Sequence, residues 1–159
     1  MRGTWPSDWE DRRRGNGCVM CAEDRPDSIE DGLRFFEGVC ADAYLHRRAP
    51  TAGYTVVIWR GRHVAEPTEL DEDEWQEFWR EVLLVARVLE AHYEPAKVNY
   101  QLLGNGVPHL HVHIVLRHWD DPAPNGPLPA SAWESGSANP VAEVDLVSTA
   151  AELRGLVGH

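Results

Sequence analysis

Short runs of β-branched and aromatic residues in the first half of the chain predict three β-strands. The first two, residues 33–38 (LRFFEG) and 42–48 (DAYLHRR), are brief and are joined by a turn. The third, residues 53–64 (GYTVVIWRGRHV), is the strongest because Val, Ile and Trp favour a pleated, half-buried backbone. Pro50 and Pro67 flank this strand. We therefore expect a sheet to begin in this part of the chain.

A long amphipathic helix is predicted directly afterwards, from residue 71 to residue 93. Asp71 can cap its N-terminus, and Glu74, three residues later, completes a capping box. Apolar residues then recur at steps of three and four, in one stripe: Trp75, Phe78, Trp79, Val82, Val85, Ala86 and Leu89. Its aromatic members could stack nucleobases, but this spacing is more typical of a core or a dimer seam. Pro95 ends the helix.

The second half of the chain returns to strand patterns. Residues 97–104 (KVNYQLLG) predict a strand, a glycine-rich turn follows, and residues 109–117 predict the last clear strand. Residues 118–140 are rich in Pro, Gly and Ser and predict an extended tail over the surface. Residues 141–159 fit either a short strand or a last helix. Strands, one long helix and further strands indicate an α+β domain with an antiparallel sheet.

We expect three parts along the chain. Residues 1–17 form a polar, mobile lead-in, in which Trp5 and Trp9 could dock on the domain. Residues 18–121 form the folded domain, and residues 122–159 form a Pro- and Gly-rich extension packed on or near it. A length of 159 residues is ordinary for a single domain with a real core.

Composition narrows the environment and the partners. The net charge of −11 argues against binding of DNA or RNA through their phosphates, although a pocket can be locally positive. No apolar stretch approaches the roughly 18–20 residues of a membrane helix, and the N-terminus lacks the apolar core of a secretory signal. We therefore expect no nucleic-acid polymer, no membrane and a cytoplasmic location. Three cysteines, Cys18, Cys21 and Cys40, also make a poor disulfide set.

The most informative run is HLHVHIV, residues 109–115, in which three histidines alternate with apolar residues. In a strand, every second side chain lies on the same face. His109, His111 and His113 would then share one face, and the residues between them would point into the core. In a helix the same histidines would scatter around the axis, so the strand is the better interpretation.

Three chemical interpretations of this row stay open. An incidental cluster is least favoured, because buried polar rings without partners are costly. The imidazoles could bind one catalytic metal ion, but the outer pair lies about 13 Å apart along the strand, so a ligand from elsewhere would help. Alternatively, a neutral imidazole attacks phosphorus while its neighbours bind phosphate oxygens and protonate the leaving group. The turn at residues 104–107 suits this last interpretation, because its backbone amides can hold a phosphate.

Cys18 and Cys21 form a Cys-x-x-Cys pair with loop sequence on both sides. A redox dithiol usually follows a strand and precedes a helix, so two thiolate ligands of a zinc site fit better. Such a site needs two more ligands, for which His63 and His109 are candidates. The remaining alternative is a pair of free cysteines. Cys40 is expected to be a small core residue.

The sequence GNGVPHLHVHIVLR, residues 104–117, resembles the signature of the histidine triad superfamily. The resemblance extends back through WRGRHVAEPTEL, the long helix and KVNYQLL, and it covers about residues 18–121. It implies a histidine-triad-like fold, in which an antiparallel sheet carries helices and two copies form a homodimer. It also implies a small nucleotide as substrate, since members hydrolyse or transfer nucleotidyl groups.

The resemblance also implies roles for single residues. His111 matches the nucleophile that attacks the α-phosphate, and His113 matches the histidine at the phosphate and leaving group. Asn99 matches a strand asparagine near the phosphate, and Asn105 stands where many members have a phosphate-contacting Gln. The turn residues Gly106 and Val107 would help to hold the phosphate.

Many triad proteins also resemble this chain in a zinc arrangement, which implies that Cys18, Cys21, His63 and His109 bind a structural zinc ion. The zinc would staple the N-terminal segment to the sheet. Two positions depart from the family pattern. Tyr54 stands where many members have a histidine after glycine, and Leu116 replaces a common proline.

The sequence therefore favours an enzyme that cleaves a dinucleoside polyphosphate or a nucleoside phosphoramidate through a covalent nucleotidyl-histidine. A zinc-stabilised nucleotide-binding or scaffold protein with little turnover is the alternative, and a metal-dependent hydrolase is a third. His46 is not expected at the site, and Arg60, Arg62 and Arg117 are expected to be solvated surface residues.

Overall fold

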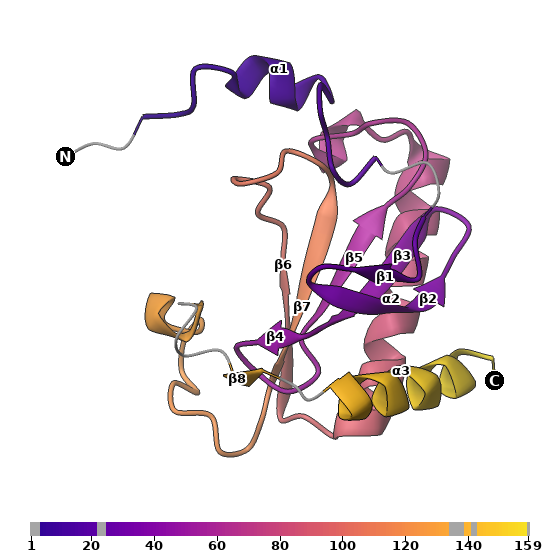
Figure 1. Cartoon of the computed structure of the whole chain (residues 1–159), viewed down its shortest axis with the longest axis vertical. Coiled ribbons are helices and arrows are strands. Elements are labelled where there is room, and N and C mark those ends of the chain that lie inside the picture. The colour runs from indigo at the N-terminus through magenta and orange to yellow at the C-terminus, as the bar shows by residue number, and fades with distance from the viewer. Residues whose placement is uncertain (1–3, 22–24, 134–138, 141–142, 159) are drawn as a thin grey trace.

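The computed structural model describes residues 4–21, 25–133, 139–140 and 143–158, which form a six-stranded antiparallel sheet flanked by helices (Figure 1). In spatial order the strands are β1 (Ser28–Ile29), β2 (Gly32–Glu37), β3 (Ala41–His46), β5 (Thr55–Trp59), β7 (His111–Arg117) and β6 (Lys97–Gln101). A separate two-stranded pairing joins β4 (Arg48–Ala49) to β8 (Asn139–Pro140). These strands confirm the predicted α+β class with an antiparallel sheet.

The helices include the long one that the sequence predicts. They are α1 (Trp9–Arg13), α2 (Glu72–Tyr93) and α3 (Glu143–Val157), with 3₁₀ turns η1 (Pro67–Glu69) and η2 (Ala130–Trp133). Asp71 caps α2 by accepting a hydrogen bond from the Glu74 amide at 2.9 Å, and the Glu74 carboxylate accepts one from the Asp71 amide at 3.0 Å. The capping box is therefore confirmed. None of the described helices is both long and apolar enough to cross a membrane.

The apolar stripe of α2 and the apolar face of α3 cover one face of the sheet. Buried residues of α2 and α3 contact those of β3, β5 and β7 there. Helix α2 contributes Phe78, Val82, Val85, Ala86 and Leu89. Each fully buried large apolar side chain of this kind contributes about 1.5–3 kcal/mol to folding. Trp75 is an exception to the predicted stripe, because it is 39% exposed and lies outside this core.

The period-two pattern of β7 separates core from site. Val112, Ile114 and Leu116 belong to the core beneath α2 and α3. Val115 lies on the opposite face, in a smaller apolar cluster that includes Tyr54. Met20 and Leu128, from segments before and after the domain's central strands, pack on that second cluster. The histidine-bearing face is thus partly covered by segments that lie before β1 and after β7.

Four strands are shorter than the sequence predicts, among them β3, which ends at His46 and not at residue 48. β5 ends at Trp59 and not at residue 64, because the indole of Trp59 donates to the Arg62 carbonyl at 2.9 Å and closes a turn. β6 ends at Gln101 and not at residue 104. β7 begins at His111, so His109 precedes the strand instead of opening it. Each shortened end releases backbone for the loops that carry site residues.

The terminal segments are more structured than expected. The lead-in contains α1, and the ring of Trp5, which precedes this helix, lies against that of Trp9 with centroids 4.5 Å apart. Figure 1 shows α1 beside the loop that joins β6 to β7. The tail contains η2, and helix α3 settles the choice between strand and helix near the C-terminus. Residues 1–3, 134–138, 141–142 and 159 of these two segments lie outside the described part, and the three domain boundaries stay a prediction.

Candidate functional site

His111 and His113 lie side by side on β7, on the face away from the main core. In the sheet they pair with Ile58 and Val56 of β5, and Gln101 of β6 lies opposite His113. The two imidazole centroids are 4.7 Å apart, at an angle of 71°. The predicted strand geometry therefore brings these two rings together.

The tautomer of His111 follows from its hydrogen bond. Its Nδ1 lies 2.5 Å from the backbone carbonyl oxygen of His109. A carbonyl oxygen only accepts, so Nδ1 carries the proton and Nε2 holds a lone pair. The residue is 6% exposed, and burial lowers its pKa. His111 is thus a neutral imidazole with a nucleophilic Nε2.

His113 contacts a tyrosine on the far side from His111. Nδ1 of His113 lies 2.5 Å from the hydroxyl oxygen of Tyr54. Burial, followed by the proximity of His111 and of His46, lowers the pKa of His113 to about 4. Burial likewise raises the pKa of Tyr54, so the phenol keeps its proton. Both rings are therefore neutral in the resting protein.

Two residues of this face, Tyr54 and His46, were not assigned to the site from the sequence. The His46 ring meets Tyr54 edge-on with centroids 4.8 Å apart, and the His46 amide donates to the Tyr54 carbonyl. Burial lowers the pKa of His46 to about 4. The signal for Tyr54 was its place after Gly53, where the family pattern has a histidine. The signal for His46 was its alternation with Tyr44 on a strand.

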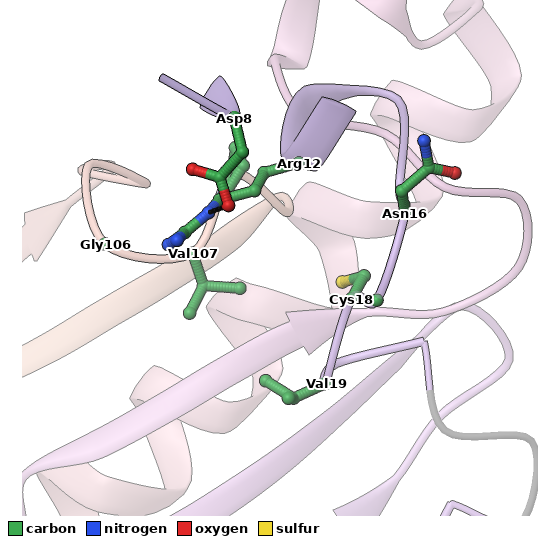
Figure 2. Close-up of a pocket in the computed structure, with 9 residues that line it drawn as sticks. Asp8, Arg12, Asn16, Cys18, Val19, Gly106 and Val107 are labelled. Carbon is green, nitrogen blue, oxygen red and sulfur yellow. Dashed lines mark hydrogen bonds and ion pairs between the residues drawn. The ribbon is translucent and has the colours of Figure 1, made fainter. Parts of the chain in front are cut away.

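The turn before β7 lies beneath α1. Asn105 and Gly106 are exposed, whereas Val107 is half-buried and its carbonyl accepts from the His109 amide. A hollow of about 320 Å³ separates this turn from the N-terminal segment. Figure 2 shows Arg12 of α1 and Asp8, the residue before this helix, reaching toward Gly106 and Val107 across it. Asn105 lines a neighbouring hollow with Trp5, Trp9 and Arg13.

Asn99 lies on β6, opposite Val115 and on the same sheet face as the two histidines. Its side-chain oxygen accepts a hydrogen bond from Arg117 Nη1 at 2.9 Å. The Asn99 amide nitrogen is thereby left as the end that can donate to an anion. Among the described residues, no hydrogen bond joins Asn99 to Asn105.

Two arginines correct the expectation of solvated surface charges. Arg117 is 5% exposed and bonds with Asp121 through two nitrogens, one of them at 2.9 Å. Arg60 is 8% exposed and donates to the Asp42 carboxylate at 2.6 Å. Both are buried because a carboxylate and backbone carbonyls satisfy their donors. Arg62 is exposed as predicted and pairs with Glu74.

Four side chains form a second cluster where the N-terminal segment meets the sheet. The ligand atoms of Cys18, Cys21, His63 and His109 all lie within 4.8 Å of one another. Nδ1 of His109 is 3.4 Å from the sulfur of Cys18, and Nδ1 of His63 is 3.2 Å from that of Cys21. The structure thus brings together all four residues that the sequence predicts for this site.

The hydrogen bonds around these imidazoles fit a zinc ion. Nε2 of His109 lies 2.7 Å from the Trp59 carbonyl oxygen, and Nε2 of His63 lies 3.1 Å from that of Arg13. Both Nε2 atoms therefore carry protons, and both Nδ1 lone pairs face the thiols. Two cysteines and two histidines are a donor set typical of closed, tetrahedral structural zinc sites. The cluster could therefore hold zinc without a change of tautomer at either histidine.

Gly15 makes room for this cluster. Its φ of +90° is unfavourable for other residues, and a β-carbon there would lie 2.8 Å from Cγ of His63. The cluster also divides the histidine row, because His109 faces the cysteines while His111 and His113 face each other. Among the described residues, this cluster is the one group of Cys, His, Asp or Glu side chains that lie close enough together to hold a metal ion. One ion bound by all three histidines therefore does not fit this structure.

Comparison with known proteins agrees with this fold. The HIT domain family matches residues 34–119. A solved histidine triad protein from Bradyrhizobium japonicum is 25% identical, with a TM-score of 0.67, over 80% of this chain and 92% of that one. Among curated proteins, no sequence matches the chain.

Two more distant structures show a similar fold. A hypothetical histidine triad nucleotide-binding protein from Sulfolobus tokodaii is 20% identical, with a TM-score of 0.65, over 89% of this chain and 92% of that one. A zinc-bound histidine triad family protein from Mycobacterium smegmatis is 20% identical, with a TM-score of 0.60, over 89% and 93% of the two chains.

Proposed function

The chain belongs to the HIT domain family, and from this premise we propose that it hydrolyses or transfers nucleotidyl groups through a covalent nucleotidyl-histidine. The observation that carries the proposal is the hydrogen bond from His111 Nδ1 to the His109 carbonyl. It leaves the Nε2 lone pair of a neutral ring free to attack, which is the state that nucleophilic catalysis needs. The substrate would be a dinucleoside polyphosphate or a nucleoside phosphoramidate.

In the first step, Nε2 of His111 forms a bond to the α-phosphorus and the bond to the leaving group breaks. The negative charge of the substrate raises the pKa of His113, so this ring takes up a proton from solvent on binding. Its Nε2 then gives that proton to the leaving group. A water molecule next attacks phosphorus, passes a proton to His113 and releases the nucleoside monophosphate from His111.

Four further residues would bind the phosphate. Asn105, Gly106 and Val107 supply polar groups and backbone amides in the turn before β7, and Asn99 supplies an amide nitrogen from β6. The exposed positions of Asn105 and Gly106 support this role, because a ligand can approach them without displacing a packed side chain.

Zinc would be structural in this protein. Cys18, Cys21, His63 and His109 would hold it, and when bound it would cross-link the N-terminal segment to the sheet. None of these four residues is assigned a chemical step. The zinc-bound relative from Mycobacterium smegmatis supports the presence of zinc sites in this fold.

The protein would act as a homodimer in the cytoplasm, with no membrane or nucleic-acid polymer as partner. Edge strand β6 presents Tyr100, which is 39% exposed, next to Trp79 of α2 with ring centroids 6.4 Å apart. Trp75 and Leu102 are exposed on the same two elements or just beyond them. An apolar patch beside an open strand edge suits a second copy of the chain.

Intact-protein mass spectrometry after rapid, acid-free quenching tests the proposal. Wild-type protein mixed with diadenosine tetraphosphate or an adenosine phosphoramidate should gain the mass of an adenylyl group for a short time. His111→Ala should lose both adduct and turnover while it still binds nucleotide. His92→Ala, which removes a histidine of α2 that pairs with Glu152 of α3, is the matched control. No adduct and no product from wild type would overturn the proposal in favour of a binding protein with little turnover.

A further inference from the structure

We propose that Tyr54 is a positioning residue, whose hydroxyl occupies Nδ1 of His113 and thereby dedicates Nε2 of that ring to the leaving group. The inference rests on the proposed function and adds to it a residue that contacts no reacting atom. Its geometric basis is the 2.5 Å separation of the Tyr54 hydroxyl oxygen and His113 Nδ1, with the two rings nearly parallel at 11°.

The local backbone explains why a tyrosine can reach His113 from this position. Gly53 has a φ of +80°, and a β-carbon on it would lie 2.6 Å from a methyl group of Leu116. Only glycine lets the chain enter β5 through this turn, after which Tyr54 lies on the opposite face. The phenol then spans the distance from the strand end to the His113 ring.

Two neighbours keep the Tyr54 ring in place. The His46 ring contacts it edge-on at 4.8 Å between centroids, and the Trp133 ring of η2 contacts it edge-on at 5.4 Å. Tyr54 itself is 6% exposed. A packed aromatic ring loses little further freedom when it forms a hydrogen bond, so the hydroxyl is a well-fixed partner.

A phenol differs from an imidazole as a partner for His113. Its oxygen donates to Nδ1 of the neutral ring and accepts from Nδ1–H of the protonated ring, so the contact survives both states. The phenol never becomes positive, so it does not oppose protonation of His113 as a second imidazolium would. Nε2 thus stays directed to the reaction in each protonation state.

Nitrogen-15 NMR of the resting protein tests the geometry without any need for turnover. In the wild type, His113 Nδ1 should show the shift of an acceptor nitrogen and Nε2 that of a protonated one. Tyr54→Phe should lose this bias and populate both tautomers. Tyr44→Phe removes a buried hydroxyl of β3 that donates to the Pro26 carbonyl, and this variant should keep the His113 tautomer of the wild type. An unchanged His113 tautomer in Tyr54→Phe would overturn the inference.

Leaving-group dependence tests the catalytic consequence. With an adenosine phosphoramidate of an alkylamine, which must be protonated to leave, Tyr54→Phe should lower kcat/KM about 10- to 100-fold. With adenosine 5′-(4-nitrophenyl phosphate), whose leaving group needs no proton, the loss should stay within about threefold. Equal losses with both substrates would show a merely structural role. If wild type cleaves neither substrate, the proposed function fails, and the NMR result still decides whether Tyr54 sets the tautomer.

Discussion

The Nε2–H group of His63 donates a hydrogen bond to the backbone carbonyl oxygen of Arg13, with 3.1 Å between nitrogen and oxygen. Through this contact the last turn of α1 is joined to the Cys/His cluster. The other imidazole nitrogen of His63 faces the sulfur of Cys21. The position of α1 over the turn before β7 therefore depends on the same ring that would bind the metal.

Zinc should bind stoichiometrically, and its loss should release the N-terminal segment. Elemental analysis should find zinc in the wild type and in Cys40→Ala, whose thiol lies in the core against Glu81, but little in Cys21→Ser. Removal by a chelator should lower the melting temperature by roughly 10 °C or more. Trypsin should then cut after Arg12, Arg13 or Arg14. Equal zinc in Cys21→Ser and wild type would contradict the assignment.

Asp42→Asn should destabilise the fold by about 3 kcal/mol, because it leaves the buried Arg60 and the half-buried Arg25 without their carboxylate. Asp42 is fully buried and accepts from both Arg25 and Arg60. Urea unfolding followed by tryptophan fluorescence measures the change. Asp73→Asn, at an exposed position in the first turn of α2, is the control and should shift the free energy of unfolding by less than about 0.5 kcal/mol. A loss as small as the control's would refute the structural role of Asp42.

Acid should destabilise the wild type partly through His46. Its folded-state pKa is about 4, lowered from an ordinary value near 6.5 by burial and by His111, with Asp31 acting in the opposite direction. Between these two values the unfolded chain binds the proton and the folded chain does not. Stability from this group is therefore full above pH 6.5 and falls, by up to about 3 kcal/mol, as the pH drops to 4.

His46→Phe should remove that part of the pH dependence. Denaturant unfolding at several pH values between 4 and 7 gives the two curves, and their difference should grow as pH decreases. Parallel curves would mean that His46 titrates alike in the folded and unfolded chain. Comparison of the two proteins cancels the contributions of the other histidines to first order.

Tyr100→Asp should shift a dimer toward monomer. A carboxylate introduced beside Trp79 at the open edge of β6 would be desolvated when a second copy packs there. Light scattering after size exclusion should show a lower mass for this variant at micromolar concentration. Trp119→Ala, at a position 85% exposed in the loop after β7, should keep the wild-type mass. A monomeric wild type would contradict the dimer proposal.

Much of the fold could be predicted from local sequence patterns, because these patterns reflect interactions between residues that are close in the sequence. The Asp71–Glu74 capping box and the α2 stripe involve neighbours one helical turn apart, so the sequence alone places them. The row of histidines likewise predicts its own strand face. What it could not predict is that β7 starts at His111, because that boundary depends on the contact between His109 and segments 90 residues away.

The other misses also depend on structure that local sequence patterns do not encode. Arg60 and Arg117 read as surface charges because their partners, Asp42 and Asp121, are recognisable only once the sheet and its following loop are built. Tyr54 and His46 become neighbours through the pairing of β3 with β5. Local polarity says where a charge prefers to be, and tertiary pairing decides whether burial is tolerated.

His109 combines two dependences in one position. Its side chain belongs to the Cys/His cluster, and its backbone oxygen accepts a hydrogen bond from Nδ1–H of His111. Substitution of His63 would remove one ligand and leave that oxygen in place, whereas substitution of His109 would also free the backbone that orients His111. Substitutions should therefore be tolerated better at His63 than at His109, although both side chains belong to the same cluster. A metal-free form of this protein would then arise more readily by loss of another ligand than by loss of His109.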